Sequence, residues 1–234
     1  MGLEAMGGAR CRTCAEPGEF SDARCPRCAL RPPPFEQAIA PYHHEGPLAR
    51  AIHRFKYEDH PELARPLGAL LAEAVADVFG STSHRRGNHP ERSPPNHPER
   101  SGAESRGPRI DEPPASAFSL CAIPLHKSRY AQRLYDQAEL LTSELSKKLK
   151  FPHLGALERV RATSRQVGLS EAARELNVRD AFRAVADVKG KDLLLVDDVL
   201  TTGATARAAA GALKEAGANR VVLLTLARAA TEPE

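Results

Sequence analysis

The stretch LLLVDDVLTTGAT, residues 193–205, constrains the fold of this chain more than any other. Its first four residues are continuously apolar, as expected of a strand that is covered on both faces of a parallel sheet. Two adjacent carboxylates, Asp197 and Asp198, follow, and a Thr/Gly loop then leads into an alanine-rich helical segment. Ligands of open parallel sheets bind beyond the carboxyl ends of the strands. The stretch therefore predicts an α/β domain with a ligand site at this strand end.

The loop after the acid pair suits an anion. The first N–H groups of a helix are unpaired and the helix dipole is positive at that end. We predict that a sugar 5-phosphate is held by Thr201, Thr202, Gly203, Ala204 and Thr205. The paired acids would accept hydrogen bonds from vicinal ribose hydroxyls, and Mg²⁺ nearby would lessen their repulsion. The alternative is an acidic turn followed by an ordinary helix cap, and the GxxxxGK[ST] phosphate loop is missing.

Strands and helices alternate around this stretch. Apolar runs predict strands at 118–125, 158–162, 193–200 and 221–227. Helical spacing predicts helices at 128–149, at 171–176 and from the Thr/Gly loop to Gly217. In the first of these, Leu134, Ala138, Leu141 and Leu145 share one face. The alternation implies a parallel sheet with right-handed crossovers.

The chain divides by composition. Residues 35–80 carry two apolar stripes with helical spacing, separated by Pro61, and are predicted to be the helical N-terminal part of a core domain that continues over 117–234. Between them, 81–116 contains seven prolines and repeats NHPERS, so we expect a disordered insertion. Its histidines and arginines are interpreted as solvated, with metal or nucleic-acid binding as the alternative.

The first 28 residues contain four of the five cysteines, in the pattern C-x2-C-x10-C-x2-C. This spacing is typical of tetrahedral Zn²⁺, and the candidate ligands are Cys11, Cys14, Cys25 and Cys28. A finger and linker over 1–34 has little core of its own, so the metal would supply folding energy. Four ligands close the coordination shell, which predicts a structural site. Two redox CxxC pairs are the alternative.

Composition also excludes some classes of protein. No run approaches the roughly 18 apolar residues of a membrane span. The first residues lack a secretory pattern and the cysteine count is odd, so we expect a cytoplasmic, reducing location. A net charge of +3 is too slight to imply nucleic-acid binding by itself, and 5% aromatic residues offer few stacking platforms for single strands.

Residues 193–205 closely resemble the phosphoribosyl pyrophosphate (PRPP) signature of type I phosphoribosyltransferases. With the cysteine finger, IPLHKSRYAQRLYDQAELL at 123–141 and VRATSRQVGLSEAARELNVRDAF at 160–182, the order of motifs is similar to that of the ComF family of competence-associated proteins. The resemblance covers nearly the whole chain apart from 81–116. The family usually reads RGYNQ or RGFNQ where this chain has RLYDQ at 133–137, so we expect a changed surface there but the same fold.

The resemblance implies a type I phosphoribosyltransferase-like parallel sheet flanked by helices, with an N-terminal zinc-ribbon-like finger. Asp197 and Asp198 would be the catalytic acids. Pyrophosphate would bind at Leu125, His126, Lys127 and Arg129. A mobile hood over the site would carry Arg161, Arg165 and Gln166. For the last two groups, solvated basic surface residues are the alternative.

Three functions are open at this point. The first is an enzyme that transfers phosphoribose from PRPP, bound with Mg²⁺, to an unidentified base or amine. The second is a non-catalytic PRPP-fold module that acts in DNA uptake through competence proteins or single-stranded DNA. The third is a zinc-ribbon adaptor whose α/β domain is inert. The residues identify neither the acceptor nor the oligomeric state.

Overall fold

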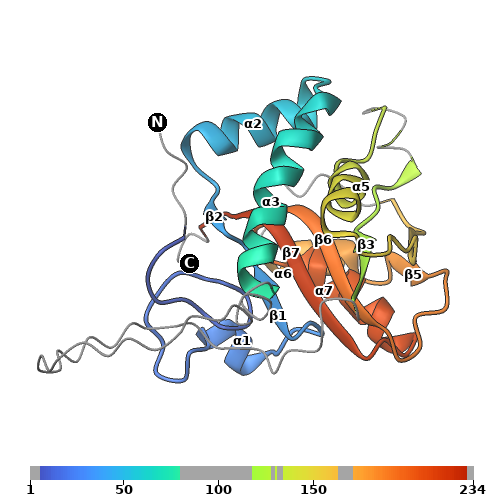
Figure 1. Ribbon diagram of the computed structural model, residues 1–234. Coiled ribbons are helices and arrows are strands. Elements are labelled where there is room, and N and C mark those ends of the chain that lie inside the picture. Colours follow the sequence, from blue (N-terminus) through green and yellow to red (C-terminus); the bar gives the residue numbers. More distant parts are fainter. Residues whose placement is uncertain (1–5, 80–117, 128–129, 131–133, 163–170, 231–234) are drawn as a thin grey trace, which may run out of the picture.

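The computed structural model of the chain describes residues 6–79, 118–127, 130, 134–162 and 171–230. These residues form a parallel sheet with helices on both faces (Figure 1). The strand order is β1–β7–β6–β3, and β2 also pairs with β7. The strands are β1 (Gln37–Ile39), β2 (Tyr42–His43), β3 (Phe118–Ala122), β6 (Asp192–Leu200) and β7 (Arg220–Arg228). The predicted parallel α/β fold is therefore confirmed.

The central strand β6 is buried on both faces. Successive side chains of a strand point to opposite faces of the sheet. Leu193 and Leu195 accordingly pack in one core, whereas Leu194 and Val196 pack in the other, and all four are 0% exposed. Burying each of them stabilises the fold by about 1.5–3 kcal/mol. The first core is covered by α7 (Ala204–Glu215), and the second by α2 (Gly46–Tyr57), α3 (Ala64–Phe79) and α5 (Gln137–Leu149).

The N-terminal helices follow the predicted stripes. Leu48, Ile52 and Phe55 are buried on one face of α2. The short 3-10 helix η1 (Pro61–Leu63) separates α2 from α3, because the chain leaves the helix at Asp59, whose φ is left-handed at 55°, and Pro61 then begins η1. The strands β1 and β2 were not predicted, since runs of three and two residues are too short for a period to register. They are extended because they pair with β7.

One predicted strand lies outside the main sheet. The segment predicted at 158–162 forms β4 (Leu157–Arg159), which pairs antiparallel with β5 (Phe182–Ala184). The outer edge of β3 is occupied instead by residues 152–154, which precede β4 in the chain. The Leu120 N–H donates to the Pro152 carbonyl at 2.7 Å, and the Leu154 N–H donates to the Leu120 carbonyl at 2.8 Å. The prediction that every strand joins one parallel sheet was wrong for this segment.

The helix predicted at 128–149 is not continuous, because Lys127 and Tyr130 are helical but the chain breaks at 134–136. Helix α5 begins at Gln137, and Leu134 is 69% exposed with a left-handed φ of 63°. Asp136 causes the late start, because its side chain accepts a hydrogen bond from the Glu139 N–H and caps the helix. An acid followed three residues later by glutamate is a capping signal that helical periodicity alone overlooks. The predicted helix near 171–176 is α6 (Glu171–Val178).

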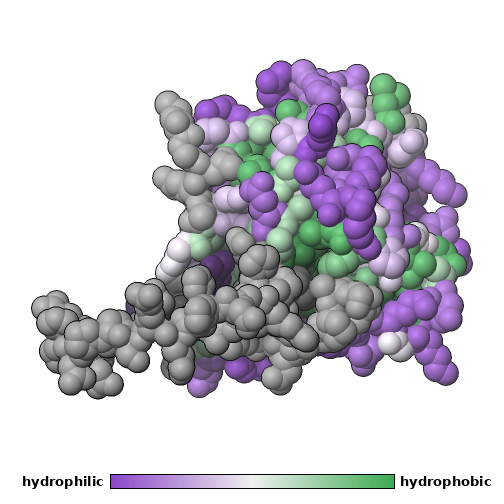
Figure 2. All heavy atoms as spheres, viewed as in Figure 1, coloured by the Kyte–Doolittle hydropathy of each residue, from purple (hydrophilic) through white to green (hydrophobic). Residues whose placement is uncertain are grey.

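The cysteine-rich segment packs against the same sheet. Its short helix is α1 (Pro26–Leu30), and the Ala38 N–H of β1 donates to the Thr13 carbonyl at 2.8 Å. Figure 2 shows hydrophilic residues over most of the surface around α2 and hydrophobic ones at the centre of the view, over the sheet. No helix in the described ranges is long and apolar enough to cross a membrane. The predicted insertion at 81–116 lies outside the described residues.

Candidate functional site

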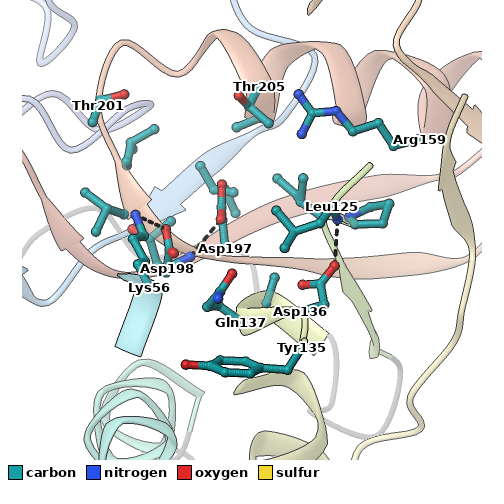
Figure 3. Close-up of a pocket in the computed structure, with 18 of the residues that line it drawn as sticks. Lys56, Leu125, Tyr135, Asp136, Gln137, Arg159, Asp197, Asp198, Thr201 and Thr205 are labelled. Atoms are coloured by element: carbon teal, nitrogen blue, oxygen red, sulfur yellow. Dashed lines mark hydrogen bonds and ion pairs between the residues drawn. The ribbon is translucent and has the colours of Figure 1, made fainter. Parts of the chain in front are cut away.

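A cavity of about 900 Å³ opens at the carboxyl ends of the central strands. It lies where β3 has ended at Ala122 while β6 continues to Leu200, so the acid pair projects beyond the last pairing with β3. Asp197 and Asp198 both line it, three and two residues before the end of β6 (Figure 3). Residues of α2, of the turn before α5 and of the start of α7 form the other walls. The predicted acids are thus found in a cavity at the expected edge of the sheet.

The two carboxylates have separate partners. The Lys56 ammonium, from α2, lies 2.8 Å from Asp198 Oδ1, and the two side chains are only 21% and 10% exposed. Asp197 Oδ1 instead accepts the Asp198 N–H at 2.8 Å. Because neighbouring strand residues face opposite ways, Asp198 is directed to the side covered by α2. Repulsion between adjacent like charges is therefore reduced by a partly buried cation from a distant helix.

These contacts change how the site holds protons. Burial, followed by the charge of Asp198, raises the pKa of Asp197 to about 8, with Lys56 acting in the opposite direction. Burial disfavours the charged form of Lys56, but the charge and hydrogen bond of Asp198 raise the pKa of Lys56. The surroundings therefore favour an ion pair between Lys56 and Asp198, and the raised pKa of Asp197 favours its protonated form in the free site. A divalent cation binding there would displace that proton.

The Thr/Gly loop lies beside the acids. Gly203 caps α7 with a left-handed φ of 82°, a conformation that glycine adopts readily. Four of the five predicted phosphate ligands line the cavity: Thr201, Gly203, Ala204 and Thr205. Thr202 does not; its carbonyl accepts from the Arg27 guanidinium at 3.3 Å, on the side of the cysteine finger. The structure places the acid pair and the loop at the same cavity. Their roles in ligand binding stay predictions.

The residues predicted to bind pyrophosphate are only partly at the cavity. Leu125 lines it, and its N–H donates to Asp136 Oδ2 at 2.6 Å. His126 and Lys127 are not among its lining residues. The Lys127 side chain is 87% exposed and lies 3.4 Å from Glu158. Arg129 lies outside the described residues, so of this group the described geometry brings only Leu125 to the site.

The predicted hood residues are not assembled at the cavity in the described part of the chain. Arg161 is exposed and donates to the carbonyls of Asn177, at 3.2 Å, and of Arg179. Arg165 and Gln166 lie outside the described residues. The hood therefore stays a prediction.

The cavity also contains residues that the sequence analysis did not select. Arg159, at the end of β4, is 6% exposed, and its guanidinium lies 5.1 Å from the centre of the Phe182 ring. Figure 3 shows Arg159 and Thr205 across the cavity from Lys56. Tyr135 also lines it and donates its hydroxyl to the Phe55 carbonyl at 2.6 Å. No pattern in the sequence marks Arg159, and Tyr135 belongs to the RLYDQ motif at 133–137 without being a predicted ligand.

The four predicted metal ligands form one cluster. The sulfurs of Cys11, Cys14, Cys25 and Cys28 lie within 4.8 Å of one another, all buried and none in a disulfide. Hydrogen bonds from Cys14 and Cys28 lower the pKa of Cys11, and the contact with Cys11 raises the pKa of Cys14 to about 12. The cluster therefore favours one thiolate but disfavours a second. A bound cation is needed for all four sulfurs to be thiolates. The cysteines could hold a metal ion such as zinc, whose tetrahedral thiolate geometry they fit.

Comparison with known proteins supports this architecture. Residues 136–234 match the family model described as phosphoribosyl transferase domain. DNA utilization protein YhgH of Escherichia coli K12 is 30% identical over 219 residues, covering 93% of this chain and 83% of that protein. Competence protein F of Haemophilus influenzae is 28% identical over 223 residues, covering 94% and 84%. Ribose-phosphate pyrophosphokinase of Vibrio vulnificus is 40% identical over 76 residues, covering 30% and 24%.

Among solved structures, glutamine PRPP amidotransferase from B. subtilis, complexed with ADP and GMP, matches with a TM-score of 0.40 and 19% identity. It covers 74% of this chain and 30% of that one, and a likeness this loose supports no conclusion about the chain. The long matches to YhgH and competence protein F carry the assignment. With its cysteine cluster followed by a phosphoribosyltransferase domain, the chain belongs to the ComF family of competence-associated proteins.

Proposed function

We propose that the chain binds PRPP as its Mg²⁺ complex and transfers phosphoribose to a nitrogen nucleophile. One observation carries the proposal: an acid pair and a glycine-capped helix start, separated by four residues, line the same cavity of about 900 Å³. A ribose 5-phosphate presents a diol and a phosphate dianion in one small molecule. The acids would accept from the diol, and the loop N–H groups would bind the phosphate.

The charges of the cavity support a diphosphate beside the sugar. Arg159 is a nearly buried cation at the wall opposite Lys56, and we assign it to the pyrophosphate group. A guanidinium meets phosphate oxygens through paired donors, which suits a leaving group that gains charge. This assignment replaces the exposed Lys127 as the principal cation.

The chemical step breaks the bond between ribose C1′ and the pyrophosphate oxygen, and the electron pair leaves with pyrophosphate. The nitrogen nucleophile then donates its lone pair to C1′, and its proton passes to the released pyrophosphate. C1′ carries developing positive charge as the bond breaks, so the carboxylates of Asp197 and Asp198 would stabilise it. The phosphate loop would bind the 5-phosphate, which lies away from the reacting bond, and would thereby hold C1′ in position.

Calorimetric titration with Mg-PRPP tests the proposal. The wild type should bind, and Asp197→Asn with Asp198→Asn should weaken binding at least about 100-fold, since two charged hydrogen-bond acceptors are lost. The control is Glu73→Gln with Glu215→Gln, which removes two charges from exposed helix positions. Binding that is absent in the wild type, or equal in the two double variants, would contradict the proposal. Pyrophosphate release with candidate bases then tests turnover.

The names of the relatives favour a second candidate function. YhgH is a DNA utilization protein and the Haemophilus protein is a competence protein, so the chain is also a candidate for a non-catalytic module in DNA uptake. Such a module would bind single-stranded DNA with strong salt dependence and without releasing pyrophosphate. The cytoplasm is the proposed location in either case, because none of the five cysteines forms a disulfide.

A further inference from the structure

The back of the phosphate loop, Thr201 to Thr205, is tied to the cysteine finger. Arg228, the last residue of β7, is 1% exposed. Its guanidinium donates to the carbonyls of Leu200, at 3.1 Å, and of Thr201. The same guanidinium donates to the carboxylate of Glu16. A buried arginine therefore bridges the loop and a finger residue that lies two positions after Cys14.

A second arginine comes from within the finger itself. Arg27 stands between Cys25 and Cys28, and it donates to the Thr202 carbonyl at 3.3 Å. It also lies 3.5 Å from the Glu16 carboxylate. Glu16 is in turn held by the finger backbone, because its carbonyl accepts from the Cys11 N–H at 2.8 Å. One carboxylate thus positions both arginines, and the turns that carry the cysteines position the carboxylate.

Peptide geometry links these contacts to the cavity. The C=O and N–H of a trans peptide point in opposite directions. When the carbonyls of Thr201 and Thr202 are drawn toward the arginines, the N–H groups of Thr202 and Gly203 are directed to the other side of the loop. Thr201 and Gly203 line the cavity on that side.

We infer that Glu16, Arg27 and Arg228 are positioning residues through which the cysteine finger orients the N–H groups of the phosphate loop. The inference rests on the proposed function, since it assigns the loop to a sugar 5-phosphate. Anion affinity at the cavity then depends on an intact finger, and hence on the metal that the cysteines would hold. The cysteine finger would then contribute to phosphate binding, in addition to any contact that it makes with a partner protein.

The test uses the full chain with its metal and compares Arg27→Ala with Arg24→Ala. Arg24 is an exposed arginine of the same finger, next to Cys25. The ¹⁵N order parameter of the Gly203 amide should be about 0.85 in the wild type and in Arg24→Ala. In Arg27→Ala this order parameter should fall toward about 0.6. Affinity for ribose 5-phosphate should fall about three- to tenfold in Arg27→Ala alone, as for one lost hydrogen bond.

Glu16→Ala frees both arginines, so it should loosen the Thr202 amide as well as that of Gly203. Metal content should stay at the wild-type ratio in both arginine variants, which shows that the finger is intact. A Gly203 order parameter in Arg27→Ala equal to that in Arg24→Ala would overturn the inference. A wild type that binds neither ribose 5-phosphate nor Mg-PRPP would overturn the proposed function instead, and the order parameters would still decide whether the finger orders the loop.

Discussion

The acid pair and the phosphate loop follow each other on the chain but are stabilised in different ways. The Asp198 carboxylate is paired with Lys56, which itself lines the cavity. The loop carbonyls are held from behind by Arg27 and Arg228. A partner inside the cavity can be exchanged for a ligand, whereas partners behind the wall remain in place. The acids are therefore suited to respond to a ligand, and the loop is suited to be preorganised for one.

The largest expected effect concerns the stability of the acid pair. Asp198→Ala leaves Lys56 mostly buried without its carboxylate, and should lower the free energy of unfolding by about 3 kcal/mol. Lys56→Met in the same background should restore most of this loss, because the unpaired charge is gone. Urea unfolding at pH 7 measures both, with Lys147→Ala as a surface control that changes stability by less than about 1 kcal/mol. No recovery in the double variant would mean that Lys56 is not the partner that matters.

A smaller effect is expected at the loop. Gly203 has a φ of 82°, and an added Cβ would meet only Leu200 Cδ1 at an ordinary 3.5 Å. Gly203→Ala should therefore cost about 1–2 kcal/mol through backbone strain alone. Gly155→Ala is the control, since Gly155 has no close neighbour and no left-handed φ. Equal unfolding midpoints for the two variants would argue against a preorganised loop.

The pH dependence should distinguish the two regions further. Asp197 has a folded pKa of about 8, above its unfolded value, so its contribution to stability is present at low pH and is lost as pH rises through 8. Relative to Asp197→Asn, the wild type should lose stability between about pH 4 and pH 8, with little further loss above pH 8. Calorimetry at pH 7 in buffers of different ionisation enthalpy should also show nearly one proton released when Mg-PRPP binds. A proton count near zero would contradict the raised pKa.

The smallest effect is expected at the position where the chain departs from the usual family motif. Asp136 accepts the N–H groups of Leu125, at 2.6 Å, and of Glu139, at 3.2 Å. Burial raises the pKa of Asp136. Asparagine caps helices about as well as aspartate does, so Asp136→Asn should change the free energy of unfolding by less than about 1 kcal/mol. Asp136→Ala removes the cap and should lower the free energy of unfolding by about 1–2 kcal/mol. Urea unfolding compares the two, and an equal loss in both would show that the charge, and not the acceptor, is what the site needs.

Much of the fold could be predicted because its signals are local. The apolar run of β6, the stripes of α2 and the cysteine spacing each lie within a short window, and each matches the element found there. Predictions failed where a local signal competed with another. The start of α5 was misplaced because the helical period continues through Leu134, whereas the cap at Asp136 decides where the helix begins.

The candidate site divides in the same way. Acid pair and loop are adjacent on the chain, so their joint presence at one cavity followed from the strand and helix that flank them. Arg159 could not be selected, because the residues that it meets at the cavity are far away in sequence. The exposure of Lys127 could not be predicted either, since a strand end does not determine which way the next side chains turn.

The amino-acid sequence by itself determined the parallel α/β fold, the metal-binding pattern and the order of acids and loop, since hydrophobic period, ligand spacing and chain adjacency are all properties of short segments. Only the tertiary structure decided that Lys56 neutralises Asp198 and that Glu16 and Arg27 reach the back of the phosphate loop. The physical reason is that charges act through distance in space. Residues separated by more than 140 positions in the chain meet within 3.5 Å once the sheet has formed.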